Sequence, residues 1–350
     1  MANAPAKRKT ATKRTTRRTL KPPIVIDVHT HVVVPEVFKE TASHALNARI
    51  GLPDATNMST AGGGQETDVE LMTGLDTRIR DMNKMGIDIQ IISPSIVHQC
   101  AYWAEPKKGL ALDKLGNDRI AEIVAQYPDR LAGMCCVPLQ DPKAAARELE
   151  RSVKRLRLKG VEISSHVNDW ELGDKNLWPF WRKAESLGVP VFIHPAGNSD
   201  PRLRKYAFAY TIGQPWEEVL AISSLVFEGV MDKFPKLKIM VGHGGGYLPY
   251  YAGRLDNGYR NAKRNKRPTR LKRDLSGYLK KFYYDNVIFN TDMLEFLAAK
   301  ATPKHIMMGT DYPYAERRPV QFVRSSKKLS RADQDAILGG NAARLFNIPV

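Results

Sequence analysis

Five side chains of the kinds that bind metal ions follow short apolar runs of this sequence, and they are His29, His31, His194, His243 and Asp311. His29 and His31 lie two residues apart, a spacing that puts both imidazoles on one side of an extended segment. Three imidazoles and one carboxylate, with room left for water, suit Zn²⁺ or a similar divalent ion such as Mn²⁺ or Fe²⁺. The sequence therefore predicts one catalytic metal site, with zinc as the expected ion.

The roles of these five side chains form a second prediction. We interpret His29, His31, His194 and Asp311 as the ligands, and His243 as an acid or base beside the bound water or substrate. Each residue taken alone also fits a structural role, an imidazole bonded to a carbonyl or an aspartate in a turn. Because all five end a strand-like run, we favour the metal site. The three glycines after His243 either bring backbone amides close to an anion or form a tight turn.

Eight strand-like runs position these side chains, and a helical segment follows each run. The runs are Ile24–Val28, Ile87–Ile92, Leu131–Val137, Gly160–Ile163, Val189–Ile193, Leu237–Val241, Phe282–Ile288 and His305–Met308. Helical periodicity covers roughly 72–85, 113–127, 142–156, 176–187, 215–233, 247–259, 291–300, 317–328 and 332–346. This alternation predicts a (β/α)₈ TIM barrel, whose strands all end at one mouth. A doubly wound open sheet is the alternative, but no Gly-x-Gly-x-x-Gly follows the first strand.

Two connections, Val34–Glu70 and Pro195–Gln214, exceed the usual length of about 2–6 residues. Barrel active sites are built from the loops at the C-terminal ends of the strands. We therefore expect both segments to be lid loops over the mouth, with tolerated surface excursions as the alternative.

The formal charge of +17 on 350 residues suggests a polyanionic partner, but the distribution of this charge argues against one. Residues 1–21 and residues 260–273 each hold eight Lys and Arg and no acid, which leaves about +1 for the rest. Neither run interleaves the aromatic residues of single-strand binders. We expect a basic tail over 1–22, a barrel over 23–350 and no nucleic acid. A polyanion-binding protein that uses the tail is the alternative of another class.

Cysteine usage and hydropathy indicate the compartment. Three cysteines without a Cys-x-x-Cys motif cannot form a disulfide framework, which favours a reducing compartment. The longest apolar runs fall far short of the ~18 residues that a membrane-spanning helix needs. We expect a cytoplasmic protein without a membrane segment.

Several motifs, in the same order along the chain, resemble the amidohydrolase superfamily. They are Asp-Val-His-Thr-His at 27–31, Val-Phe-Ile-His-Pro at 191–195, Phe-Pro-Lys-Leu-Lys-Ile-Met-Val-Gly-His-Gly-Gly-Gly-Tyr-Leu-Pro-Tyr at 234–250 and Gly-Thr-Asp-Tyr-Pro at 309–313. The likeness covers about residues 24–348 and is closest to the metal-dependent decarboxylase branch, typified by aminocarboxymuconate semialdehyde decarboxylases.

The resemblance implies a single metal held by the four predicted ligands, with His243 assisting proton transfer. The fourth strand ends without the lysine that bridges two metals in hydrolytic relatives, in agreement with one metal. The resemblance also implies that Arg254 meets a substrate carboxylate in the neighbouring subunit, so we expect a homodimer. An ion pair between Arg254 and Asp256 is the alternative.

Two departures from the branch point to a different substrate. The lid arginine has no counterpart in Ala-Gly-Gly-Gly-Gln-Glu at 61–66, and Ala196 stands where the branch has tryptophan. Tyr102, Trp103 and Trp170 either line the substrate ring or belong to the core. We predict nonoxidative decarboxylation of an aromatic or unsaturated hydroxy carboxylic acid, a small-molecule carboxylate. Hydrolysis of a lactone, amide or C–C bond, or hydration of a double bond, is the alternative reaction.

Overall fold

A computed structural model describes residues 23–41, 68–94, 101–195, 200–206, 208–266, 271–314 and 316–349. Its centre is a parallel sheet of eight strands in the order β1-β2-β3-β4-β7-β8-β9-β10. The strands are β1 (Ile26–Val32), β2 (Ile89–Pro94), β3 (Leu131–Cys135), β4 (Gly160–Ile163), β7 (Pro190–Ile193), β8 (Lys238–Val241), β9 (Tyr283–Asp285) and β10 (Ile306–Met307). A separate hairpin pairs β5 (His166–Val167) with β6 (Trp170–Glu171).

The first and last strands approach each other and close the sheet into a barrel. The amide of Val28 donates to the carbonyl of Met308 at 3.0 Å, and Asp311 donates to His29 at 2.8 Å. A parallel bridge joins Thr30 to Tyr312 just beyond β10. These contacts confirm the predicted (β/α)₈ barrel and exclude the alternative, an open doubly wound sheet.

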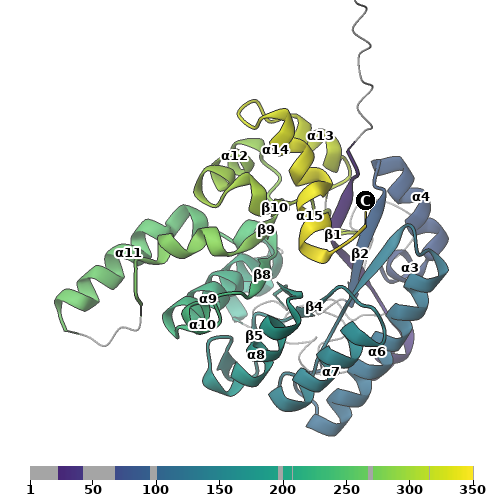
Figure 1. Ribbon diagram of the computed structural model, residues 1–350, viewed down its shortest axis with the longest axis horizontal. Coiled ribbons are helices and arrows are strands. Elements are labelled where there is room, and N and C mark those ends of the chain that lie inside the picture. Colours follow the sequence, from purple (N-terminus) through teal and green to yellow (C-terminus); the bar gives the residue numbers. More distant parts are fainter. Residues whose placement is uncertain are drawn as a thin grey trace, which may run out of the picture.

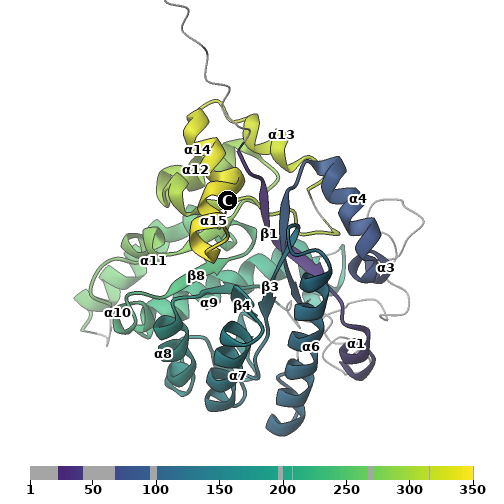
Figure 2. The same cartoon turned by 45° about the vertical axis from the view of Figure 1, so that its right-hand side comes forward.

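Helices surround the barrel, as Figures 1 and 2 show. They are α1 (Pro35–Thr41), α3 (Asp68–Thr73), α4 (Leu75–Met85), α6 (Pro106–Gln126), α7 (Pro142–Lys154), α8 (Trp178–Leu187), α9 (Gln214–Phe227), α10 (Val230–Lys233), α11 (Leu248–Arg264), α12 (Thr291–Lys300), α13 (Pro319–Arg324), α14 (Arg331–Asp335) and α15 (Asn341–Phe346). Local sequence explains their bounds. In α7, for example, Pro142 stands in the first turn and the Asp141 carboxylate accepts from the amides of Lys143 and Ala144.

The interior of the barrel holds a small apolar cluster that α15 closes from one end. Ile26, Ile91 and Phe192 of the strands share this cluster with Leu345 and Phe346 of α15. Figure 2 shows α15 lying beside β1. Because one end of the barrel is packed in this way, the other end, where the strands finish, is the end available to a substrate.

Several predictions concern segments that the structure describes only in part or not at all. The tail 1–22 and most of the first long connection lie outside the described residues, although α1 begins that connection. The second connection contains a short 3₁₀ helix (Pro201–Arg204) and a π-helical turn (Ala209–Gly213), and the lid role of both connections stays a prediction. Within the described ranges, no helix is long and apolar enough to cross a membrane.

Candidate metal centre

The five predicted side chains meet at the mouth of the barrel. The ring centroid of His29 lies 5.2 Å from that of His31, 4.9 Å from His194 and 5.2 Å from His243. The Asp311 carboxylate lies 3.0 Å from Nε2 of His31 and 3.3 Å from Nε2 of His29. Potential ligand atoms of His29, His194, His243 and Asp311 all lie within 4.8 Å of one another. Side chains from four strand ends therefore surround one space.

Unpaired ring nitrogens indicate that this space suits a metal ion. Nε2 of His29 and Nδ1 of His194 are buried and have no hydrogen-bond partner, and the same holds for Nδ1 of His31, whose Nε2 is the nitrogen that faces Asp311. A buried polar atom without a partner is costly, so such atoms are rare unless a ligand satisfies them. Three unsatisfied imidazoles beside a carboxylate fit a divalent cation, the donor set that the sequence predicts.

Burial and neighbouring charge put these groups in the protonation states that coordinate metals. Burial lowers the pKa of His29 and holds that of His194 well below its ordinary range, so both rings are neutral. Burial by itself would raise the pKa of Asp311. Its interactions with His29, His243 and His31 outweigh this effect of burial and hold the pKa of Asp311 well below its usual value, so the carboxylate is ionised.

Two buried carboxylates orient the imidazoles from behind. Nδ1 of His29 lies 2.6 Å from Oδ2 of Asp285, the last residue of β9. Burial opposes ionisation of Asp285, but the hydrogen bond from His29 keeps its pKa lowered, so the imidazole donates and Nε2 is left facing the site. Nδ1 of His243 lies 2.6 Å from Oε1 of Glu218 on α9. The first arrangement fixes the tautomer of the His29 ring, as carboxylates behind metal-bound histidines do, and the second orients the ring of His243.

The backbone is unusual where the site is built. His243 has φ of 46° and Asp311 has φ of 56°, a left-handed conformation that costs side-chain-bearing residues about 1–3 kcal/mol each. The glycines at 244–246 also have positive φ and form the tight turn expected after β8. Gly309 permits the approach of β10 to β1, because a Cβ there would lie 2.9 Å from Cβ of His29. Left-handed backbone conformations of residues with side chains therefore occur at two of the five predicted site residues.

The predicted substrate residues lie in three different environments. Tyr102 is buried in the main apolar core and Trp170 packs against it, while Lys108 lies 5.6 Å from the ring of the partly buried Trp103. Arg254 is exposed on α11, and no ion pair to it is found among the described residues. Asp256 is buried and accepts from the amide of Ser276.

Sequence reasoning missed Asp285 and Glu218. Asp285 ends β9 in the structure, but the predicted run extended to Ile288 and placed it in the middle of a strand. Glu218 lies inside a helix, where no strand end marks it. It is fully buried, and burial raises the pKa of its carboxyl group to about 7.

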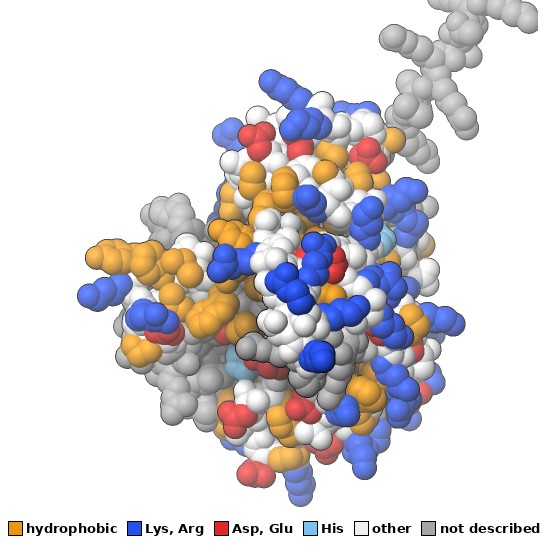
Figure 3. Space-filling view, turned by 90° about the vertical axis from the view of Figure 1, so that its left-hand side faces the viewer, with side chains coloured by type: hydrophobic (Ala, Val, Ile, Leu, Met, Phe, Trp, Pro, Cys, Tyr) orange, Lys and Arg blue, Asp and Glu red, His pale blue; other side chains and the backbone are white. Residues whose placement is uncertain are grey.

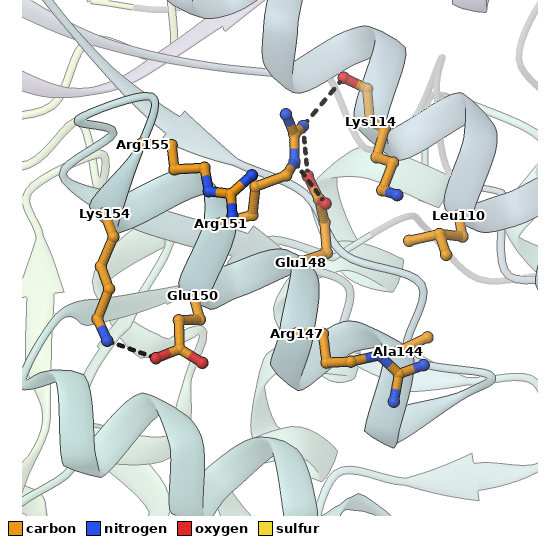
Figure 4. A pocket seen from close by; sticks show the side chains of 9 residues that line it. All are labelled: Leu110, Lys114, Ala144, Arg147, Glu148, Glu150, Arg151, Lys154 and Arg155. Atoms are coloured by element: carbon orange, nitrogen blue, oxygen red, sulfur yellow. Dashed lines mark hydrogen bonds and ion pairs between the residues drawn. The ribbon is translucent and has the colours of Figure 1, made fainter.

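A well-formed hollow lies elsewhere, on the outer surface between α6 and α7 (Figure 4). It has a volume of about 460 Å³ and is lined by Leu110, Lys114, Ala144, Arg147, Glu148, Glu150, Arg151, Lys154 and Arg155. Its acids are already paired, Glu148 with Arg151 at 2.8 Å and Glu150 with Lys154 at 2.5 Å. None of the predicted site residues lies in it.

The fold and the site together define a metal-dependent enzyme built on a (β/α)₈ barrel. Residues 26–348 match the amidohydrolase family, and the chain belongs to that family. One relative, the 2-amino-3-carboxymuconate-6-semialdehyde decarboxylase of Dictyostelium discoideum, is 34% identical over 278 residues, covering 78% of this chain and 76% of its own.

Two solved structures of decarboxylases share the fold of this chain. The 5-carboxyvanillate decarboxylase of Sphingomonas paucimobilis is 29% identical, with a TM-score of 0.78 over 93% of this chain and 99% of its own. A dihydroxybenzoic acid decarboxylase of Polaromonas, solved with manganese and the inhibitor 2-nitroresorcinol, is 26% identical, with a TM-score of 0.76 over 93% of this chain and 97% of its own.

Proposed function

We propose that this protein is a carboxy-lyase that removes CO₂, without oxidation, from a hydroxylated aromatic or unsaturated carboxylic acid. The observation that carries the proposal is the set of buried, unsatisfied imidazoles around the Asp311 carboxylate at the barrel mouth. The decarboxylases among its relatives support the reaction type.

His29, His31, His194 and Asp311 would hold the metal in this proposal. A bound divalent ion supplies Lewis acidity toward a substrate oxygen. Three nitrogens and one oxygen favour zinc, whereas the Polaromonas relative holds manganese. Metal analysis of protein purified without chelator distinguishes these two ions, and less than about half an equivalent of either per chain would contradict the site.

His243 is proposed to carry the proton to the carbon that loses CO₂. Its side chain is 13% exposed, whereas those of His29 and His31 are 0% and 2% exposed, so His243 is the more accessible imidazole. Burial alone would lower its pKa, but the charges of Glu218 and Asp311 raise it well above the ordinary value, which favours a ring that can donate. These observations support proton transfer by His243, although its ring also lies within the group of side chains that could hold a metal, a group that does not include His31.

A panel of acids tests the reaction. Phenolic acids such as dihydroxybenzoates and muconate-type acids are incubated with the metal-loaded enzyme, and CO₂ is measured together with the organic product. Release of CO₂ in equal amount with the decarboxylated product is expected. A hydrolysed or hydrated product without CO₂ would replace the decarboxylase by a hydrolase or hydratase of the same family.

A homodimer that completes each site with Arg254 of the second subunit is the proposed assembly. The largest exposed apolar side chains among the described residues come from only three segments, which follow β7, β8 and β9: Tyr206, Tyr210, Ile212, Leu220, Tyr247, Tyr251, Phe289 and Met293. Figure 3 shows hydrophobic side chains gathered along one edge of this side of the molecule. Tyr247, Tyr251 and Arg254 share one face of α11. Such a patch supports a protein interface beside the arginine.

Mixing two inactive variants tests this assembly. Arg254→Ala and His29→Ala are unfolded and refolded together, so that some dimers contain one chain of each kind. If Arg254 serves the other subunit, mixed dimers hold one complete site and about a quarter of wild-type activity returns. No recovery, with mixed dimers verified by two affinity tags, would place Arg254 in its own subunit's site or outside both.

The cytoplasm is the proposed compartment, and the free Cys135 and Cys136 support it. A polyanion-binding role for the basic tail is tested separately. Removal of residues 1–21 is expected to leave activity unchanged. Loss of activity together with salt-dependent DNA binding would favour the alternative function.

A further inference from the structure

A buried arginine lies directly behind the metal centre. Arg78 of α4 has no exposed surface, which is rare for a cation. Its Nη2 donates to the backbone carbonyl of His31 at 2.5 Å, and its Nη1 donates to Oε1 of Gln90 at 3.0 Å. Its guanidinium carbon also lies 4.7 Å from the centre of the Tyr312 ring. Arg78 thus contacts the residue His31 itself and the residue that follows Asp311.

The strand ladder is irregular where Arg78 contacts it. Asp27 pairs with Gln90 and Thr30 pairs with Ile92, so two residues of β1 stand opposite one residue of β2. The extra residue falls at His29 or its neighbour. Such a bulge interrupts regular hydrogen bonding. Side chains must therefore help to fix the backbone that carries the first two predicted ligands.

A second group holds the same backbone from the other side. The Asp27 carboxylate accepts from the His29 amide at 3.2 Å, from the Thr310 amide at 3.0 Å and from the Thr310 hydroxyl at 2.6 Å. Nε2 of Gln90 donates to Asp27 at 3.1 Å, which links this carboxylate to Arg78. A continuous chain of buried hydrogen bonds therefore connects α4 to both segments that carry His29, His31 and Asp311.

We propose that Arg78, through Gln90 and Asp27, is a positioning residue that sets the geometry of the metal ligands on the first and last strands. The inference rests on the metal site of the proposed function. In this proposal, Arg78 contacts neither the metal nor the substrate. It fixes the carbonyl of one ligand residue and the aromatic ring beside another, so its removal frees the ligands to spread. Outer groups that orient ligands typically change metal affinity about 10–100-fold when they are lost.

The chemistry of the guanidinium explains why arginine is needed here. Its planar fork donates in two directions at once and its face stacks on Tyr312, whereas a lysine ammonium is a single flexible point charge. Arg78→Lys should retain the charge but lose one of the two directed contacts or the stacking. We expect its metal affinity to lie between those of the wild type and Arg78→Met.

The experiment measures metal affinity independently of activity. Wild type, Arg78→Lys, Arg78→Met and Gln90→Leu are stripped of metal and titrated with Zn²⁺ and Mn²⁺ by calorimetry. Gln90→Leu breaks the link between Arg78 and Asp27 but keeps the bond from Arg78 to the carbonyl of His31, so it serves if Arg78→Met fails to fold. Arg80→Met is the matched control, because Arg80 is exposed on the same helix and its one side-chain hydrogen bond found among the described residues is to Thr77.

The dissociation constant should rise about 10–100-fold in Arg78→Met and by a smaller factor in Arg78→Lys and Gln90→Leu, while Arg80→Met matches the wild type. The visible absorption spectrum of bound Co²⁺ reports the geometry of the ligands, and it should change in the same order of variants. A variant that is only less stable would keep the wild-type spectrum. Folded variants that bind metal with wild-type affinity and an unchanged Co²⁺ spectrum would overturn the inference. A wild type that binds neither ion would instead contradict the proposed function.

Discussion

The barrel mouth and the hollow between α6 and α7 both concentrate charged side chains, but they differ in burial and pairing. In the hollow, Lys154 is 62% exposed and Glu150 is 36% exposed, and the two pair with each other. At the mouth, His29 is fully buried and Asp311 is only 16% exposed. Solvent and the opposite charge stabilise Lys154 and Glu150, whereas the buried Glu148 of the hollow is bonded to Arg151.

This contrast separates a charged surface from a site. Three imidazoles at the mouth retain buried nitrogens without partners. The acids that line the hollow have ion-pair partners on neighbouring cations. Isolated unsatisfied atoms also occur elsewhere, for example Nδ1 of His305, so the mouth is distinguished by unsatisfied imidazoles that lie together beside a carboxylate. The predictions below test this difference.

The largest effect is expected from His29→Ala at the mouth. It removes an imidazole whose Nε2 has no other partner and leaves Asp285 without the group it orients. Tightly bound metal and activity should both be lost, as shown by metal analysis after dialysis and by CO₂ release. His305→Ala, which removes an imidazole packed on Tyr283 far from the strand ends that form the site, should retain both. Full metal content in the His29 variant would exclude it as a ligand.

A smaller but still large effect is expected from Glu218→Gln. Its carboxylate lies 2.6 Å from His243, the ring proposed to transfer the proton, and orients it. Loss of an oriented acid–base pair typically lowers kcat about 10²–10⁴-fold, and we expect the lower end with KM little changed. The adjacent Glu217→Gln is the matched control, because Glu217 pairs with His166 at 3.1 Å instead. Equal losses in both variants would show that Glu218 has no special role.

The sequence predicted the mouth far better than the groups that support it. Apolar runs and parallel topology determine which residues reach the mouth, so the five strand-end residues were found together and all eight strands were confirmed. Asp285 was missed because the predicted seventh strand ran three residues past the observed end of β9. Glu218 and Arg78 lie on helices, where periodicity marks them as ordinary polar positions. Their burial depends on how helices pack against the barrel, which local sequence does not specify.

An effect of intermediate size is expected from Asp113, which lies on α6 near the hollow. Unlike the residues on the rim of the hollow, Asp113 is buried. Burial raises the pKa of Asp113 to about 7, from an ordinary value of 3.8. The folded state then holds a proton that the unfolded state has released, so this residue's contribution to stability falls as pH rises from about 4 to 7. Above pH 7 the cost should be on the order of a few kcal/mol, since one pKa unit corresponds to about 1.4 kcal/mol.

Asp113→Asn removes this cost, since the amide resembles the protonated acid in shape. Urea unfolding should show similar stability of variant and wild type at pH 4, and a more stable variant at pH 8. The exposed Asp118→Asn, on the same helix, should show no such gain with pH. A constant difference at both values would mean that Asp113 stays ionised when buried.

The smallest effect is expected on the rim of the hollow, from Lys154→Ala. Lys154 and Glu150 form an i,i+4 pair in solvent, and Glu150 keeps a second partner in Lys183 at 2.9 Å. Solvent screens such a pair and ordering its long side chains costs entropy, so the net contribution is small. Melting temperature, metal content and activity should all stay within the error of measurement. A marked loss of activity would give the hollow a role that its paired, exposed charges do not indicate, and would remove the distinction between the two regions.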